Sequence, residues 1–183
     1  MNATTHAVFG VAALAGASLL VGNEPPLYAY PAAVVAAWVP DIDNPRSRLG
    51  NGLSRTKSPV LNTIARPVSW ALRAASFTLS RTVGHRTLTH SLLGVALFVA
   101  LVSPVAPLSP ELFFALVAGY TSHLVADALN VKGVALLWPV GRRFRLLPGG
   151  VRSGGIAEFV VALAAVVVAG YGIYELHLGF AGV

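Results

Sequence analysis

Four short motifs carry the histidines and carboxylates of this chain that could do chemistry. The clearest is Ser122-His123-Leu124-Val125-Ala126-Asp127, in which His123 and Asp127 stand four residues apart. Side chains at that spacing project from one face of a helix, so the pair can bind one cation, or the carboxylate can orient the imidazole. Ionisable groups in an apolar helix usually mark function or a polar bundle interior. A structural pair satisfied within the bundle is the alternative.

A second motif, His85-Arg86-Thr87-Leu88-Thr89-His90-Ser91, stands at the start of another apolar segment. Histidines five residues apart do not share a helix face. They can still converge on one centre if His85 lies in a loop and His90 lies in the first helical turn. Thr87 or Thr89 is placed to cap that helix by accepting from a free backbone N–H. Two inert histidines at a membrane surface are the alternative.

The third motif, Pro40-Asp41-Ile42-Asp43, places two carboxylates directly after an apolar segment. Alternate carboxylates in an extended turn can bridge two divalent ions, or one can bind an ion while the other is a general base. We therefore expect Asp43 to be a bridging ligand or the acceptor of a proton from an attacking water, with Asp41 as a second catalytic residue. Acidic residues beside the Asn44-Pro45 turn are also common as solvated helix ends.

The fourth element is His6, which follows two threonines at the mouth of the first apolar segment, and Glu158 mirrors it at the start of the last. A single His or Glu at such a position is ordinary. Their predicted roles as metal ligands therefore depend on the other three motifs.

Helices in a membrane are the elements expected to position these motifs. Apolar residues make up 55% of the 183-residue chain and charged residues only 11%, which leaves too little polar surface to cover a globule in water. We expect an all-α fold in a single domain over residues 1–183, namely a polytopic membrane helical bundle of about four to five spans. The apolar segments are Ala7–Gly22, Leu27–Val39, Leu88–Val105, Leu112–Leu129 and Ile156–Leu176.

One of these segments is too short to span in the ordinary way. Leu27–Val39 reaches only about 20 Å as a helix, against a hydrocarbon core of about 30 Å. It is expected to be short, tilted or re-entrant. One interfacial amphipathic helix is also predicted, because a polar stripe recurs at helical spacing in the segment before His85. The stripe consists of Asn62, Arg66, Ser69, Arg73, Ser76 and Ser80.

The positive charges predict the topology. All thirteen Lys and Arg residues fall in two loops, eight between Asp41 and Thr87 and five between Val131 and Gly155. Cytoplasmic loops of membrane proteins retain such residues, so both loops are expected on the cytoplasmic side of the membrane. All four motifs then lie at that face.

Together the motifs resemble the LexA-regulated, inner-membrane metal-dependent hydrolase family. The matching pieces are Thr5-His6 with Gly10, Pro40-Asp41-Ile42-Asp43 with Ser47, His85-Arg86 through Thr89-His90-Ser91, and Ser122-His123 through Asp127 followed by Gly133 and Trp138-Pro139. The resemblance implies a metal-dependent hydrolase whose single site combines His6, Asp41, Asp43, His85, His90, His123 and Asp127, with Glu158 as a further member.

Imidazole and carboxylate must hold any metal here, because the chain has no cysteine. Seven or eight such donors exceed the three protein ligands typical of one catalytic zinc. One or two divalent ions are expected, with zinc the best match to the imidazoles and manganese or iron also compatible. The expected chemistry is attack of an activated water on an ester or phosphoester.

Arginines near the motifs suggest what is hydrolysed. A guanidinium group matches phosphate oxygens in a bidentate manner, so Arg86, Arg142, Arg143 and Arg145 are predicted to bind the headgroup of an amphiphilic substrate, with Arg86 also catalytic. Positive-inside bias with general attraction to membrane lipids is the alternative. Nucleic acid is not an expected partner, because no nucleic-acid module is recognisable.

Two other functional classes stay open. A metal transporter needs polar groups across the whole bilayer, and the outer halves of these segments offer almost none. A non-catalytic scaffold with a structural metal site differs from an enzyme by having no open coordination position.

Overall fold

The computed structural model describes residues 1–43 and 87–179 of the chain. Within those ranges every regular element is helical, and the extended pairing consists of two isolated backbone bridges, Asn130 with Val151 and Val134 with Phe144. The prediction of an all-α fold is therefore confirmed. The predicted amphipathic stripe between Asn62 and Ser80 lies outside the described residues.

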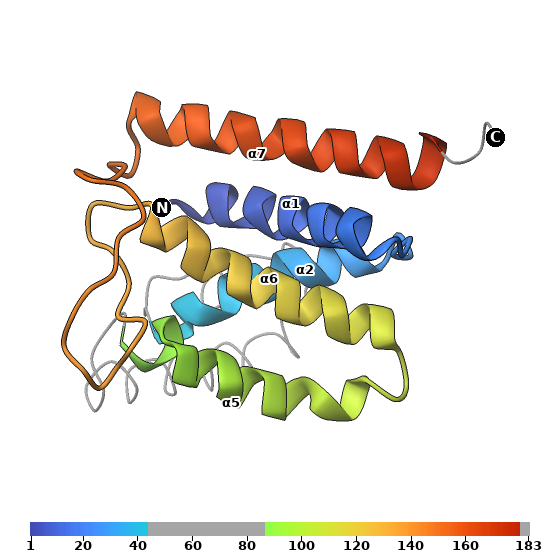
Figure 1. Cartoon of the computed structure of the whole chain (residues 1–183), viewed down its shortest axis with the longest axis horizontal. Helices are drawn as coiled ribbons and strands as arrows, with labels where there is room; N and C mark the ends of the chain where they lie inside the picture. The colour runs from blue at the N-terminus through green and yellow to red at the C-terminus, as the bar shows by residue number, and fades with distance from the viewer. Residues whose placement is uncertain (44–86, 180–183) are drawn as a thin grey trace, which may run out of the picture.

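In the described ranges, five α-helices run roughly along one axis (Figure 1). They are α1 (Ala3–Val21), α2 (Ala29–Trp38), α5 (Leu92–Val102), α6 (Pro110–Ala128) and α7 (Ile156–Tyr174). The short turns of the same ranges extend or precede these helices: the 3-10 turns η1 (Val39–Asp43), η3 (Leu88–His90) and η4 (Ser103–Val105), and the π-helical turn η5 (Glu175–Gly179).

Side-chain caps explain why two helices begin where they do. The Asn2 side chain accepts from the backbone N–H of Thr5 at 2.8 Å, so α1 begins four residues earlier than its apolar pattern predicted. Ser91 accepts from the N–H of Gly94 at 3.1 Å and starts α5. The predicted continuous segment Leu88–Val105 is consequently divided into η3, α5 and η4.

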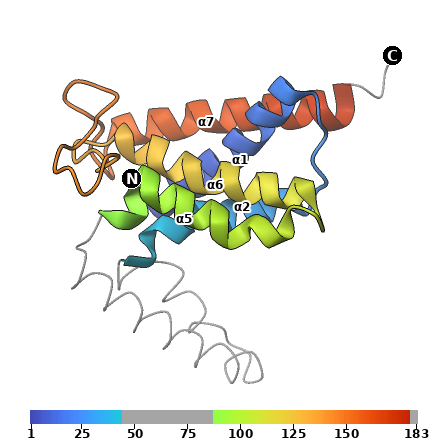
Figure 2. The same ribbon diagram turned by 60° about the horizontal axis from the view of Figure 1, so that its bottom comes forward.

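Small residues allow α1, α2 and α6 to pack closely. A Cβ atom built on Gly10 of α1 would lie 2.8 Å from the carbonyl oxygen of Ala33 in α2, and one built on Gly119 of α6 would clash with the same oxygen. Ala33 itself is fully buried. Close backbone approach through Gly and Ala is typical of helices that associate in a membrane. These three helices form the centre of the bundle (Figure 2).

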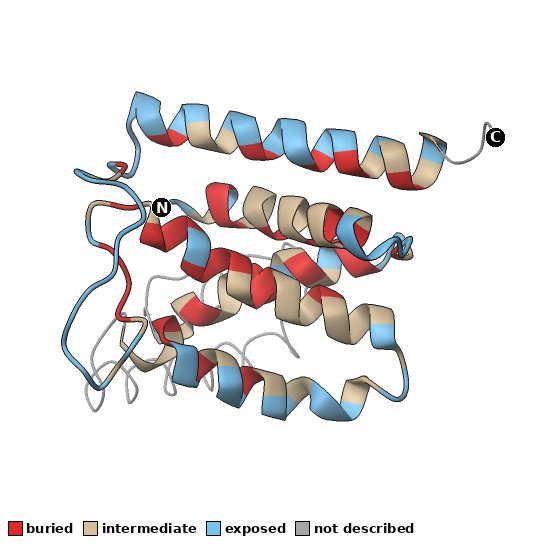
Figure 3. Ribbon diagram, viewed as in Figure 1, coloured by how far each residue is buried: buried red, intermediate tan, exposed pale blue. Residues whose placement is uncertain are grey.

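Helix α7 packs along α1 and leaves its other face uncovered (Figure 3). That face carries large apolar side chains, with Phe159 67% exposed and Val167 63% exposed. An exposed apolar face of this size is unusual for a protein in water and expected for one in lipid.

Two described helices are long and apolar enough to cross a membrane, Ala3–Val21 with 19 residues and Ile156–Gly179 with 24. The apolar helices Ala29–Ile42 and Leu92–Val105 are shorter. Helix α6 has 19 residues but carries Glu111, His123 and Asp127. The expected number of four to five spans is thus not confirmed by the lengths of the described helices.

Residues 129–155, which we call the basic loop, connect α6 to α7 at the end of the bundle that also holds the N-terminus (Figure 1). Backbone hydrogen bonds fix this loop to the helices. Leu146 N–H donates to the carbonyl of Ala128 at 2.8 Å, and Leu92 N–H donates to the carbonyl of Leu136 at 2.9 Å. The loop therefore has a defined position despite lacking regular structure.

Candidate metal centre

Five polar side chains from four parts of the chain meet at the end of the bundle nearest the basic loop. We call them the donor cluster: His6 of α1, Asp41 of η1, His90 of η3, and His123 and Asp127 of α6. The side chains of the three histidines and of Asp127 are fully buried, whereas that of Asp41 is 22% exposed. Access to the cluster is therefore on the Asp41 side.

Helix α6 supplies two of these side chains from one face, as the spacing of His123 and Asp127 predicted. Their nearest atoms, His123 Nε2 and Asp127 Oδ2, are 3.9 Å apart. One turn earlier, Tyr120 donates from its hydroxyl to the carbonyl of Thr89 at 2.7 Å. This bond fixes η3 against α6 and so brings His90 to the pair.

The end of α2 is fixed to the same place by two hydrogen bonds. Trp38 donates from its indole N–H to the carbonyl of Ala3 at 2.7 Å, which joins α2 to the first turn of α1. His123 Nδ1 lies 2.7 Å from the carbonyl oxygen of Ala37. A carbonyl only accepts, so Nδ1 carries the proton and the unprotonated Nε2 of a neutral His123 faces the cluster.

Four atoms surround one point in the cluster. His123 Nε2 lies 3.1 Å from His90 Nε2 and 3.9 Å from Asp41 Oδ1. His90 Nε2 in turn lies 3.8 Å from Asp41 Oδ1 and 3.7 Å from Asp127 Oδ2. Ligands about 2.0–2.1 Å from a common ion are separated by roughly these distances. Two imidazoles and two carboxylates also form a donor set suited to zinc, manganese or iron.

His6 lies on the other side of Asp127. Its Nε2 is 3.5 Å from Asp127 Oδ1, and its ring stacks on that of His123 with centroids 3.7 Å apart. Neither ring nitrogen of His6 has a hydrogen-bond partner in the described part of the chain. A fully buried imidazole without a partner is costly, so this observation fits a site that binds a cation.

The N-terminal ammonium of Met1 also reaches this region, donating to Asp127 Oδ1 at 2.7 Å in a fully buried ion pair. Sequence reasoning missed this group, as well as Tyr120, Trp38 and the Ala37 carbonyl. For Tyr120 a signal was available, since it precedes His123 by three residues and shares its helix face.

Glu158 lies in the first turn of α7, as predicted, and its carboxylate accepts hydrogen bonds from the start of α1 and from the basic loop. Its Oε1 accepts from Asn2 N–H at 2.6 Å and from the Thr5 hydroxyl at 2.8 Å, and its Oε2 accepts from Gly154 N–H at 2.5 Å. The carboxylate therefore fastens the start of α1 to the start of α7 and, among the described residues, is not a member of the groups that could hold a metal ion. Two backbone N–H groups and one hydroxyl satisfy its buried charge.

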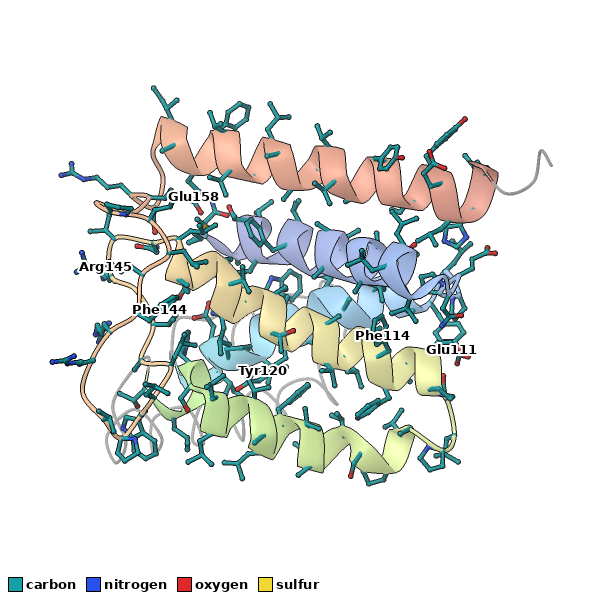
Figure 4. All side chains as sticks on the ribbon, in the orientation of Figure 1. Glu111, Phe114, Tyr120, Phe144, Arg145 and Glu158 are labelled. Atoms are coloured by element: carbon teal, nitrogen blue, oxygen red, sulfur yellow. The ribbon has the colours of Figure 1, made fainter. Side chains whose placement is uncertain are left out.

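The remaining predicted site residues are less closely tied to the cluster. His85 and Arg86 lie outside the described residues, and of Asp43 the structure describes the backbone at the end of η1. Arg142, Arg143 and Arg145 are exposed on the basic loop. Within the described part of the chain they make no ion pair or hydrogen bond with the cluster, and Figure 4 shows Arg145 at the outer edge of the loop.

Comparison with known proteins reveals relatives over nearly the whole chain. The model of a family described as "YdjM inner membrane protein" matches residues 1–181. The Bacillus subtilis protein YvsG is 31% identical over 179 residues, which cover 98% of both chains. The inner membrane protein YdjM of Escherichia coli is 35% identical over 120 residues, 63% of this chain and 52% of that protein, and YdjM of Shigella flexneri matches equally. No solved structure matches this chain.

Proposed function

The chain belongs to the YdjM inner membrane protein family, and from this membership and the buried donor cluster we propose that it is a membrane-embedded metal-dependent hydrolase. Its substrate would be an ester or phosphoester of a lipid or other amphiphile at the cytoplasmic face. The observation that carries the proposal is the convergence of His6, His90 and His123 on Asp127 inside an apolar bundle. Such groups are costly in a membrane and are usually retained for function.

The two oxygens of Asp127 support a centre with two positions. Oδ2 faces His90 and His123, while Oδ1 faces His6. Because Nδ1 of His123 is occupied by Ala37, this ring can serve only one position through Nε2. His90, His123, Asp41 and Asp127 would hold one ion. A second ion, held in part by His6 and Asp127 Oδ1, would have to displace the Met1 ammonium from that oxygen. A bound divalent ion would polarise a carbonyl or phosphoryl oxygen of the substrate.

The protein side chains would perform the other parts of hydrolysis. Asp41, the partly exposed member of the cluster, lies where substrate and water can enter, and Asp43 follows it in the same turn. We assign the proton of the attacking water to one of these two carboxylates, with Asp43 preferred. The water oxygen forms the new bond to the acyl or phosphoryl centre as the bond to the alcohol breaks, and the leaving alcohol takes up a proton. Arg86 would bind the developing negative charge.

A turnover assay tests the proposal. The purified protein, loaded with zinc or manganese in lipid vesicles, is offered a panel of acyl-ester and phosphoester lipid analogues. Metal-dependent cleavage is expected, and chelation should abolish it while the helical circular-dichroism signal persists. Asp43→Asn should lower the rate at least about a hundred-fold, since a general base contributes roughly 10²- to 10⁴-fold. Glu111→Asn, at the opposite end of α6, is the control and should leave the rate unchanged.

A structural metal site is the second candidate, because the four atoms around His90 and His123 could fill a tetrahedral site completely. A structural site predicts the opposite outcome for both turnover and the effect of chelation. Absence of turnover over the whole panel, together with loss of helical structure on chelation, would replace the enzyme with a metal-stabilised scaffold.

A further inference from the structure

The basic loop is strongly cationic and contains no carboxylate between Asp127 and Glu158. Its five positive side chains are all exposed: Lys132, Arg142, Arg143, Arg145 and Arg152. None of them forms an ion pair with a carboxylate in the ranges that the structure describes, and Arg143 donates only to the backbone carbonyl of Lys132, at 3.4 Å. The loop therefore presents unneutralised positive charge.

Large apolar side chains are exposed between these cations. Leu137 and Val140 are each 61% exposed, and Leu146 and Leu147 are 48% and 43% exposed. In water this arrangement leaves apolar area uncovered. At a bilayer surface, apolar side chains enter the boundary between headgroups and acyl chains while Arg and Lys remain at the level of the phosphates.

The loop is also held at a defined height on the bundle. Leu146 N–H donates to Ala128 at the end of α6, and Val151 N–H donates to the carbonyl of Leu129 at 2.7 Å. The apolar helix α7 begins directly after the loop. Figure 4 shows Phe144 and Arg145 at the end of the molecule opposite Glu111. The cations consequently lie where α6 and α7 leave the apolar layer.

We propose that the basic loop is a docking surface for anionic lipid headgroups of the surrounding membrane. Each Lys or Arg near a membrane surface is attracted to anionic lipid by about 1 kcal/mol, and the interleaved apolar side chains favour a lipid surface over a nucleic acid. The loop would fix the depth and tilt of α6, and with it the donor cluster. This proposal does not depend on hydrolytic activity.

Trp138 provides a reporter inside the loop. The full chain is reconstituted in phosphatidylcholine vesicles containing either brominated phosphatidylglycerol or brominated phosphatidylcholine at the same mole fraction. The fluorescence quenching of Trp138 is obtained by subtracting the signal of the Trp138→Phe variant from that of the wild type. One charge near the surface contributes about 1 kcal/mol, which is about five-fold in affinity. We expect phosphatidylglycerol to associate near Trp138 at least about five-fold more strongly than phosphatidylcholine.

Matched variants separate charge from loop structure. In the triple variant Arg142→Gln, Arg143→Gln, Arg145→Gln the ratio should fall well below the wild-type value, because three of the loop's five cations are removed. The triple lysine variant, which keeps the charge, should retain the wild-type ratio. A wild-type ratio of one would overturn the proposal. Equal loss in the lysine and glutamine variants would also overturn it, because the substitutions would then act through loop structure. Tight binding of duplex DNA that displaces the anionic lipid would assign the surface to nucleic acid instead.

Discussion

The Nε2 atoms of His90 and His123 face each other at 3.1 Å, in rings that are both fully buried. His123 directs its Nε2 inward because its Nδ1–H is bonded to Ala37, and His90 is placed by the bond between Tyr120 and Thr89. Because Nε2 of His123 is the acceptor, Nε2 of His90 can donate a hydrogen bond to it, while Nδ1 of His90 lies 3.0 Å from the Thr89 hydroxyl. The pair is thus positioned to share either one proton or one metal ion.

Removal of a donor should lower metal affinity. We expect His90→Ala, His123→Ala and Asp127→Asn each to weaken binding at least about ten-fold, the usual minimum for loss of a ligand or its partner. Metal analysis of purified protein and competition with a chelating dye measure this. His177→Ala is the control, because His177 pairs with Glu24 and Tyr30 at the other end of the bundle. Unchanged affinity in all three donor variants would exclude a metal centre here.

Glu158→Gln separates a structural carboxylate from a metal ligand. A glutamine amide has one oxygen that accepts and one NH₂ group that does not. Either Gly154 N–H or the Asn2 and Thr5 donors therefore lose their acceptor. A buried group left unsatisfied costs about 1–3 kcal/mol, and thermal or denaturant unfolding in detergent should detect that loss. Metal content should remain as in the wild type. A large fall in metal content at unchanged stability would make Glu158 a ligand.

Two glycines test the packing at the centre of the bundle. Gly119→Ala should destabilise the protein by about 1–3 kcal/mol, as overpacking does, because its Cβ would clash with the carbonyl of Ala33. Gly16→Ala is the matched control, since a Cβ at Gly16 meets nothing within 4 Å, and replacing a helical Gly by Ala gains about 0.5–1 kcal/mol. Unfolding midpoints in detergent should therefore move in opposite directions. Equal shifts would contradict this packing.

Single cysteines can determine the orientation, because the chain has none of its own. Gly141→Cys on the basic loop should be labelled only from the cytoplasmic side, and Asn23→Cys after α1 only from the opposite side. A Cβ at Gly141 meets no neighbour within 4 Å, whereas Gly150 has a positive φ and no room for a side chain. Labelling of Gly141→Cys from outside would invert the topology and move the donor cluster away from the cytoplasm.

The sequence predicted the helical class and most donors because those features are periodic or local. His123 and Asp127 share a helix face by spacing alone, and the start of α7 at Ile156 follows from its apolar run. Glu158 illustrates what a local pattern cannot show. Its partners, Asn2 and Thr5, are more than 150 residues away and include a backbone N–H. The predicted length of α5 was wrong because Ser91 caps the helix inside the predicted segment.

Every described member of the donor cluster precedes residue 128, and α7 contributes none. Chains fold from the N-terminus as they are synthesised, so α1, α2 and α6 can assemble the centre before α7 has left the ribosome. An ion bound to the donor cluster would therefore be held by helices whose synthesis is complete before that of α7 begins.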